Sequence, residues 1–275
     1  MGTTLKPFIT YLTTPSRQIG NAIADYASSP ASSFLAEVVH LSDAVNNCIR
    51  HFPKKQGGNY TKDSEDSLFR LSACTLAGVM GHLETFERFF FAGLIELSRL
   101  VPTFGMNRYC SKLSKKSGIE ISLAVATSYR GQPAPIGQLL AESLGGWHDP
   151  KKVNDYLRRL VESPVDFFSD ADIRDLRTLW QLRHSIVHTA GWITQPDSQK
   201  VAELQQFGGR HILVEPRFIE SVARRLHPML QAAVSRLESG FRTGLPGGHS
   251  RTDSRTINSL FRVESPRDCW FQQGK

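Results

Sequence analysis

A long amphipathic segment, residues 66–100, constrains the fold more than any other part of the chain. Its apolar side chains recur every seven residues, at Leu76, Leu83, Phe90 and Leu97. This spacing returns side chains to one face of an α-helix, and Pro102 would stop the helix. Three glycines within the segment each cost about 1 kcal/mol relative to alanine, and close approach of a second helix would justify them. These glycines are Gly78, Gly81 and Gly93.

Capping residues and apolar stripes predict further helices. Ser32 and Ser33 would cap a helix that runs to about residue 52, and Pro216 would begin one that Gly240 closes. Asp149 followed by Pro150 predicts a helix start, as does Ser169 with Asp172 three residues later. Residues 136–143 are also expected to be helical, and a short strand is expected over 211–214. The chain is therefore predicted to be all-α, with a small β element after the helix that ends at Gly191.

The apolar pattern divides the chain into three parts. Residues 1–31 are polar and punctuated by prolines, and they are predicted to form a peripheral arm. Residues 32–240 form the predicted helical domain. From residue 241 the apolar period is lost, and residues 241–275 contain six basic and three acidic side chains. This composition predicts a basic, flexible tail, or one that folds on a partner.

The composition narrows the classes of function. The formal net charge of +7 is a mild bias toward polyanionic partners. The four cysteines lie far apart and include no CxxC pair, which argues against a zinc finger or a disulfide framework. This cysteine usage favours a reducing compartment, and we expect a cytoplasmic protein. No uncharged apolar run reaches the roughly 20 residues of a membrane span, so no membrane partner is expected.

Six residues, Arg183-His184-Ser185-Ile186-Val187-His188, carry the strongest chemical signal. The planar fork of an arginine fits a phosphate, and a histidine exchanges protons near neutral pH. Such a pair could cleave RNA without a metal, because histidine can move the proton of the ribose 2'-hydroxyl or of the leaving oxygen. Arginine would stabilise the charge that develops on the phosphate. On an ideal helix Arg183 and His188 lie about 140° apart, so they converge only at the helix end or with help from another helix or subunit.

The segment Leu182–Gly191 resembles the R-x4-6-H motif of the HEPN superfamily. The earlier segment Val79–Phe86 resembles the His-aromatic-Glu helix of the RiboL-PSP-HEPN-like branch, and the resemblance covers about residues 66–240. It implies an all-α bundle and a metal-independent endoribonuclease that needs no cofactor. It also implies a homodimer in which two motifs face one cleft that receives RNA. Members commonly act as toxins or in antiviral defence, so an antitoxin or a defence-system partner protein is also implied.

The resemblance assigns roles to four residues. It implies that Arg183 and His188 are catalytic, and that Glu84 is a polar group that orients one of them. The chain departs from the family pattern after the arginine, where asparagine is frequent and His184 stands here. His184 would supply a second proton carrier or a hydrogen bond.

Each of these residues also has a structural alternative. Arg183 could form an ion pair with a neighbouring helix, and His188 could cap free carbonyls at the helix end. Glu84 precedes Arg88 by four residues, the ordinary spacing of a helical ion pair. His82 could be a packed histidine with no role in chemistry.

Two other functions remain open at this stage. His184 and His188 share a helix face and could bind zinc if Glu84 joined them, giving a metal-dependent hydrolase. Because no glutamate directly follows His184, the HExxH pattern is absent. The second alternative is a non-catalytic helical interaction module of a defence or toxin–antitoxin complex.

Overall fold

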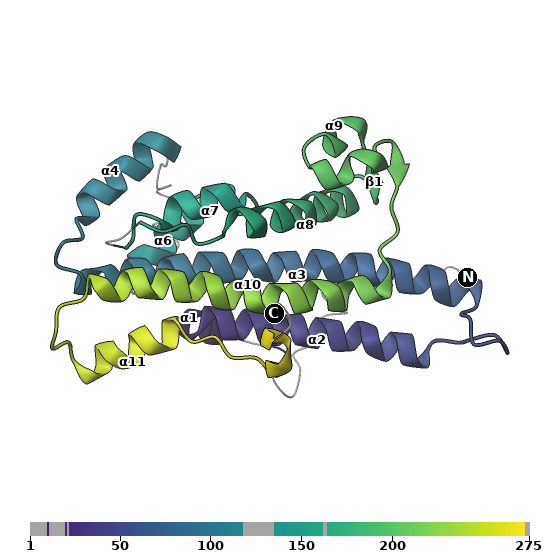
Figure 1. Cartoon of the computed structure of the whole chain (residues 1–275), viewed down its shortest axis with the longest axis horizontal. Coiled ribbons are helices and arrows are strands. Elements are labelled where there is room, and N and C mark those ends of the chain that lie inside the picture. The colour runs from purple at the N-terminus through teal and green to yellow at the C-terminus, as the bar shows by residue number, and fades with distance from the viewer. Residues whose placement is uncertain (1–9, 11–19, 21, 118–134, 162–163, 273–275) are drawn as a thin grey trace.

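The computed structural model describes residues 22–117, 135–161 and 164–272, together with the single residues Thr10 and Gly20. Three long helices lie side by side along the molecule: α2 (Pro30–His51), α3 (Lys62–Leu97) and α10 (Pro216–Thr243) (Figure 1). A second layer covers another side of α3 and consists of α6 (Ile136–Ser143), α7 (Pro150–Leu157) and α8 (Asp170–His188). The prediction of an all-α fold is confirmed.

The central helix α3 follows the predicted apolar repeat. Leu76, Leu83 and Phe90 are fully buried and Leu97 is almost so. Thr61 caps the helix, because its hydroxyl accepts a hydrogen bond from the Ser64 backbone amide. Phe90 also packs its ring against three other aromatic side chains, from α3, from the segment before α8 and from near the C-terminus: Phe86, Phe167 and Phe261. The repeat therefore anchors the core, as its spacing predicts.

The predicted close approach explains one of the three glycines well. A Cβ atom on Gly93 would collide with Leu260 of α11 (Arg251–Leu260), so the absence of a side chain lets the two helices meet. A Cβ on Gly78 would lie 3.8 Å from the Leu41 side chain, an ordinary contact. A Cβ on Gly81 would meet no described atom within 4 Å, so packing does not account for Gly81.

The predicted helix starts at Asp149 and Ser169 are confirmed, whereas the start of α2 is not at Ser32 or Ser33. Proline fits the first turn of a helix, and Pro30 begins α2 directly after Ser29. Ser32 then lies inside the helix, where its hydroxyl donates a hydrogen bond to the Arg262 carbonyl (3.1 Å).

Of the predicted arm 1–31, residues 1–9, 11–19 and 21 lie outside the described residues. The end of the arm forms α1 (Ile23–Ser28) and the start of α2, and both pack on the bundle.

The prediction of a flexible tail from residue 241 is wrong for the residues that the structure describes. Helix α10 continues to Thr243, and α11 and the 3₁₀ turn η4 (Asp268–Gln272) follow it. The apolar side chains Ile257, Leu260, Phe261 and Trp270 are buried. Two ion pairs tie this region to earlier helices, Arg99–Asp253 (2.8 Å) and Arg267–Asp43 (2.6 Å). The described part of the tail folds because its apolar side chains are buried and two of its charged side chains, Asp253 and Arg267, pair with earlier helices.

The remaining elements are short. Helix α4 (Met106–Ser117) leaves the bundle after the 3₁₀ turn η2 (Ser98–Leu100). Strand β1 (Trp192–Ile193) pairs antiparallel with β2 (Arg210–His211), and α9 (Gln195–Ser198) and the 3₁₀ turn η3 (Ala202–Phe207) lie between them. The predicted strand is therefore two residues long and begins one residue early. Among the described helices, none combines the length and the apolar character needed to cross a membrane.

Candidate functional site

Helix α8 carries the Arg183–His188 motif, and a capping box fixes its start. The Ser169 hydroxyl accepts a hydrogen bond from the Asp172 amide (3.2 Å), and the Asp172 carboxylate accepts one from the Ser169 amide (2.8 Å). Arg236 of α10 also donates to this carboxylate (3.2 Å). The buried Leu176 and Trp180 lie on the inner face of α8. These contacts fix the helix, and hence the direction in which its last turn points.

The last turn of α8 is closed by backbone groups and by a threonine. The Ser185 carbonyl accepts hydrogen bonds from the amides of Thr189 (3.1 Å) and Gly191 (2.9 Å) and from the Thr189 hydroxyl (2.9 Å). Ala190 and Gly191 have positive φ angles of 51° and 85°, which turn the chain sharply into β1. His188 forms no hydrogen bond to these carbonyls, so the structure does not use it as the helix cap.

His184 and His188 lie together on the exposed side of the last turn. Their ring centroids are 4.8 Å apart and the ring planes are tilted by 45°. Neither ring forms a hydrogen bond with a described residue. Asp197 of α9 faces His184: a hydrogen bond from Lys200 lowers the pKa of the Asp197 carboxyl, and the Thr194 hydroxyl and the nearby His184 ring act in the same direction. The two imidazoles are thus accessible, close together and next to one acidic residue.

Arg183 is half-buried, in contrast to the two histidines. Within the described part of the chain it forms no ion pair and no hydrogen bond, so the alternative of a structural ion pair finds no partner there. Its Nε atom is buried without a partner. Buried polar groups normally have partners, because leaving one unpaired costs about 1–3 kcal/mol.

Unpaired buried polar atoms are concentrated around the motif. The described residues contain eight buried side-chain nitrogen or oxygen atoms without a partner. Four of the eight belong to residues 180–185 of α8, namely Trp180 Nε1, Gln181 Nε2, Arg183 Nε and Ser185 Oγ. A local cluster of this kind marks either strain or a place where a bound molecule supplies the missing partners.

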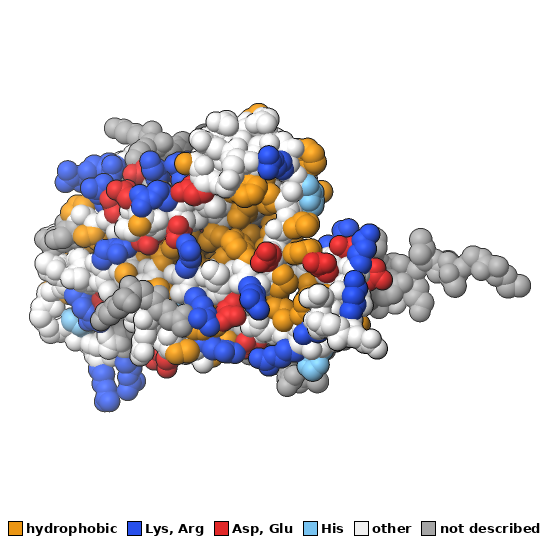
Figure 2. Space-filling view, turned by 45° about the vertical axis from the view of Figure 1, so that its right-hand side comes forward, with side chains coloured by type: hydrophobic (Ala, Val, Ile, Leu, Met, Phe, Trp, Pro, Cys, Tyr) orange, Lys and Arg blue, Asp and Glu red, His pale blue; other side chains and the backbone are white. Residues whose placement is uncertain are grey.

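An apolar groove runs beside the end of α8. A cavity of about 470 Å³ lies between α3, the end of α8 and residues 211–214, and Phe69, Ile186 and Leu213 are among its walls. Figure 2 shows hydrophobic side chains gathered in a hollow near the centre of the face that it draws. Three large apolar side chains near the motif are exposed: Val187 (47%), Trp192 (48%) and Leu213 (61%). The motif therefore borders an exposed apolar surface.

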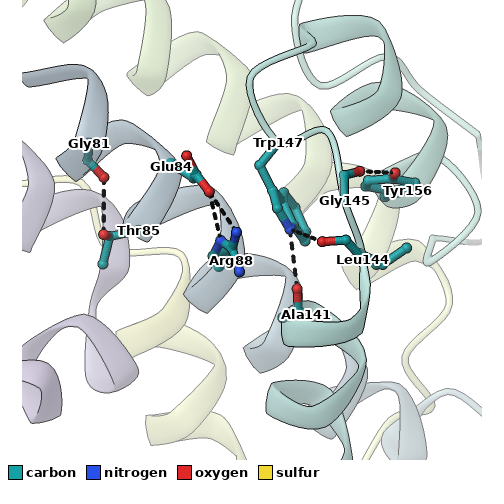
Figure 3. Close-up of polar contacts among 9 residues, drawn as sticks. All are labelled: Gly81, Glu84, Thr85, Arg88, Ala141, Leu144, Gly145, Trp147 and Tyr156. Carbon is teal, nitrogen blue, oxygen red and sulfur yellow. Dashed lines mark hydrogen bonds and ion pairs between the residues drawn. The ribbon is translucent and has the colours of Figure 1, made fainter. Parts of the chain in front are cut away.

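Glu84 does not touch the motif. Its carboxylate accepts hydrogen bonds from Arg88 Nε (3.1 Å) and Nη2 (2.6 Å), and the Arg88 guanidinium lies 5.8 Å from the Trp147 ring (Figure 3). No described hydrogen bond joins Glu84 to Arg183 or to His188. The ordinary helical ion pair accounts for Glu84, and the orienting role expected of it has no contact to support it.

Glu87, which the sequence analysis did not single out, is the most unusual acid on α3. It is completely buried and neither carboxylate oxygen has a described partner. Burial raises the pKa of this carboxyl well above its ordinary value, the charge of Glu84 raises it further, and Arg88 opposes the shift. The sequence held a signal, because Glu87 follows Leu83 by four residues and precedes Phe90 by three, on the apolar stripe of α3.

The remaining candidates are His82 and the zinc site that the two histidines of α8 could form. His82 is packed against α1, where its Nδ1 atom lies 2.9 Å from the Tyr26 hydroxyl. For the zinc alternative, His184 and His188 are adjacent, but Glu84 is held by Arg88. Across the described residues, no group of three or more His, Cys, Asp or Glu side chains is arranged to hold a metal ion.

Comparison with known proteins gives no match to a family model, to a curated protein or to a solved structure.

Proposed function

We propose that this chain is a metal-independent endoribonuclease of the HEPN type. The proposal rests on the polar groups of α8. Four buried polar atoms in residues 180–185 have no described partner, and two exposed imidazoles lie at the end of the same helix. An RNA phosphodiester offers the acceptor oxygens that an unpaired donor such as Arg183 needs. The adjacent 2'-hydroxyl gives up a proton and the leaving oxygen receives one, and histidines can transfer both. The substrate is RNA, because the 2'-hydroxyl supplies the attacking oxygen without a metal.

His188 and Arg183 have separate roles in this proposal. His188 takes the proton of the 2'-hydroxyl or gives one to the leaving oxygen. Arg183 neutralises the charge that builds on the phosphate. His184, with its ring 4.8 Å from that of His188, is the second proton carrier. Glu84 has no part in this mechanism.

We infer that a second copy of the chain completes the site. Arg183 is half-buried whereas His188 faces solvent, so one copy of α8 presents only part of the pair on each face. Val187 within the motif and Trp192 just after it each expose about half of their surface. Exposed apolar surface of this kind costs free energy, and dimerisation would remove that cost. The proposed enzyme is therefore a homodimer in which two motifs face one cleft.

The activity test compares three variants in the presence of EDTA. Purified protein should cleave RNA without added metal, and His188→Ala and Arg183→Ala should each lower the rate by about 10²–10⁴-fold. Arg177→Ala is the matched control, because Arg177 is an exposed arginine on the same helix and should leave the rate unchanged. Cleavage that EDTA abolishes and zinc restores would point to a metal hydrolase. A folded protein that cleaves no RNA would favour the non-catalytic interaction module.

Mixing the two inactive variants tests the composite site. If Arg183 of one subunit acts with His188 of the other, exchanged dimers of Arg183→Ala and His188→Ala keep one intact pair and regain part of the activity. Leu213→Asp, which places a charge on the exposed apolar surface away from the catalytic pair, is expected to weaken dimerisation in sedimentation experiments. A strictly monomeric chain with full activity would refute the composite site.

The proposed biological setting is toxin action or antiviral defence in a reducing, cytoplasmic environment, where an antitoxin or another defence-system protein restrains the enzyme. The four cysteines are all free thiols, which suits such an environment. Expression of the wild-type chain should slow cell growth and His188→Ala should not. Equal growth inhibition by both would separate toxicity from RNA cleavage.

A further inference from the structure

A second recess, distinct from the motif, lies between α4 and α7. It is a cavity of about 430 Å³ lined by both helices and by the turn at residues 145–148. Three basic side chains, Lys112, Lys152 and Arg159, line it together with a single acid, Asp155. Figure 2 shows Lys and Arg side chains gathered at the upper left, the region where α4 and α7 lie in Figure 1.

The cations of this recess are available to a ligand. Within the described residues, Lys112, Lys152 and Arg159 form no ion pair, whereas the neighbouring Arg158 pairs with Asp166 (3.6 Å). Three positive charges that line one cavity with a single carboxylate leave a net positive charge, which favours binding of an anion. A phosphate group, with up to two negative charges and several acceptor oxygens, satisfies this arrangement.

Buried hydrogen bonds hold the wall of the recess in place. The Tyr109 hydroxyl donates to the Tyr156 carbonyl (2.9 Å), and the Tyr156 hydroxyl donates to the Gly145 carbonyl (2.6 Å). The indole of Trp147 donates to the carbonyls of Ala141 (3.1 Å) and Leu144 (2.9 Å), and Figure 3 shows this cluster beneath the turn. The recess is therefore built on fixed side chains, and little ordering is required when a ligand binds.

A glycine at the turn makes room for one of the cations. Gly146 has a φ of +82°, and a Cβ atom there would lie 2.7 Å from Cδ and 2.9 Å from Nζ of Lys152. The lysine thus lies directly over the glycine backbone, at the mouth of the recess. The positive φ favours glycine at this position, and a Cβ atom there would push the end of the Lys152 side chain aside.

We infer that this recess binds a small phosphate-bearing ligand of about the size of a mononucleotide. Its volume falls in the usual range of small-molecule pockets, about 300–1,000 Å³, and the tyrosine rings give it an apolar wall beside the cations. An extended RNA strand would follow a basic groove and would not need such a recess. His148, at the rim, contacts Trp180 of α8 (ring centroids 6.2 Å apart), so the ligand lies next to the helix that carries the motif.

The test uses the full chain with defined probes in ligand-detected NMR and calorimetry. Inorganic pyrophosphate and the four nucleoside 5'-monophosphates are the probes, and the matching nucleosides without phosphate are the controls. At least one phosphorylated probe should bind at millimolar concentration or better, and its nucleoside should not. Lys152→Ala and Arg159→Ala should each weaken binding about tenfold or more.

One control variant and one further test variant make the inference refutable. Arg158→Ala removes the neighbouring arginine that is already ion-paired and should change binding little, and Gly146→Ala should displace Lys152 and weaken binding. All four substituted residues lie at the surface or in a turn, and circular dichroism will show whether the variants remain folded. If no phosphorylated probe binds, or if only a long RNA competes at this surface, the inference is wrong. Neither result depends on whether the motif cleaves RNA.

Discussion

The contact between α3 and α6 gives the sharpest prediction for stability. Gly137 of α6 is buried against α3, and a Cβ atom added to it would lie 2.8 Å from the carbonyl carbon and 2.9 Å from the Cα of Ala92. Both are backbone atoms and cannot rotate away, so the helices must separate until these contacts lengthen to about 3.4 Å or more. The same shift would stretch the hydrogen bond from the Gly137 amide to Glu96 Oε1 (2.7 Å).

The magnitude follows from these two losses. Overpacking of a buried contact costs about 1–3 kcal/mol, and weakening a hydrogen bond to a charged group adds about 1 kcal/mol. Gly137→Ala is therefore expected to lower the free energy of unfolding by about 2–4 kcal/mol and the melting temperature by roughly 5–12 °C. Urea titration followed by circular dichroism measures the first quantity.

Gly81→Ala is the matched control for this prediction. Gly81 lies inside α3, and a Cβ atom there would meet no described atom within 4 Å. The same substitution should therefore stabilise the protein by up to about 1 kcal/mol through helix propensity alone. If Gly137→Ala unfolds within about 0.5 kcal/mol of the wild type, the close approach of α6 to α3 is wrong.

Three further predictions concern a buried acid, the C-terminal helix and the start of α8. The pKa of Glu87 is raised in the folded state, so its contribution to stability is present below the unfolded pKa of about 4.5 and is lost as the pH rises. Glu87→Gln should therefore gain stability relative to the wild type between pH 4 and pH 8 in denaturant titrations, and an equal pH dependence of both would contradict this. Leu260→Ala should cost about 2–4 kcal/mol in the same assay, whereas a flexible C-terminus would show no loss. Ser169→Ala removes the capping box of α8 and should cost about 1 kcal/mol, and no change would mean that the cap contributes little.

Local chemistry explains which parts of the fold could be predicted. Helix α3 is 36 residues long and repeats one apolar spacing from Leu76 to Leu97, so the signal accumulates. Asp149 with Pro150 and Ser169 with Asp172 are caps whose partners lie within three residues, and sequence neighbours suffice to recognise them. Helix α11 has only 10 residues, and its stripe is too short to stand out until Gly93 of α3 is known to face it.

The candidate site, too, could be predicted only where residues close in sequence determine the geometry. The positions of Arg183, His184 and His188 on one helix follow from their spacing, and the structure places them at the end of α8 as predicted. The sequence alone could not decide the partner of Glu84, because an ion pair with Arg88 and a contact with the motif both fit the same residues. That choice depends on which face of α3 meets α8, a tertiary property. The sequence alone could not show that Lys112 and Lys152 line one recess, since they come from helices that only the fold brings together.

The unpaired polar groups of α8 also indicate whether its motif serves stability or function. Arg183 has no described partner, and the caps of the helix end come from Thr189 and Gly191, so neither the arginine nor His188 is needed to hold the last turn. Unpaired buried atoms at Trp180, Gln181, Arg183 and Ser185 each lower stability, and replacement by apolar side chains of similar size would remove that cost. A helix that serves packing alone gains nothing from such atoms. Of these four side chains Arg183 alone is half-buried, so its guanidinium is the one that can meet a substrate's oxygens, whereas Trp180, Gln181 and Ser185 are buried.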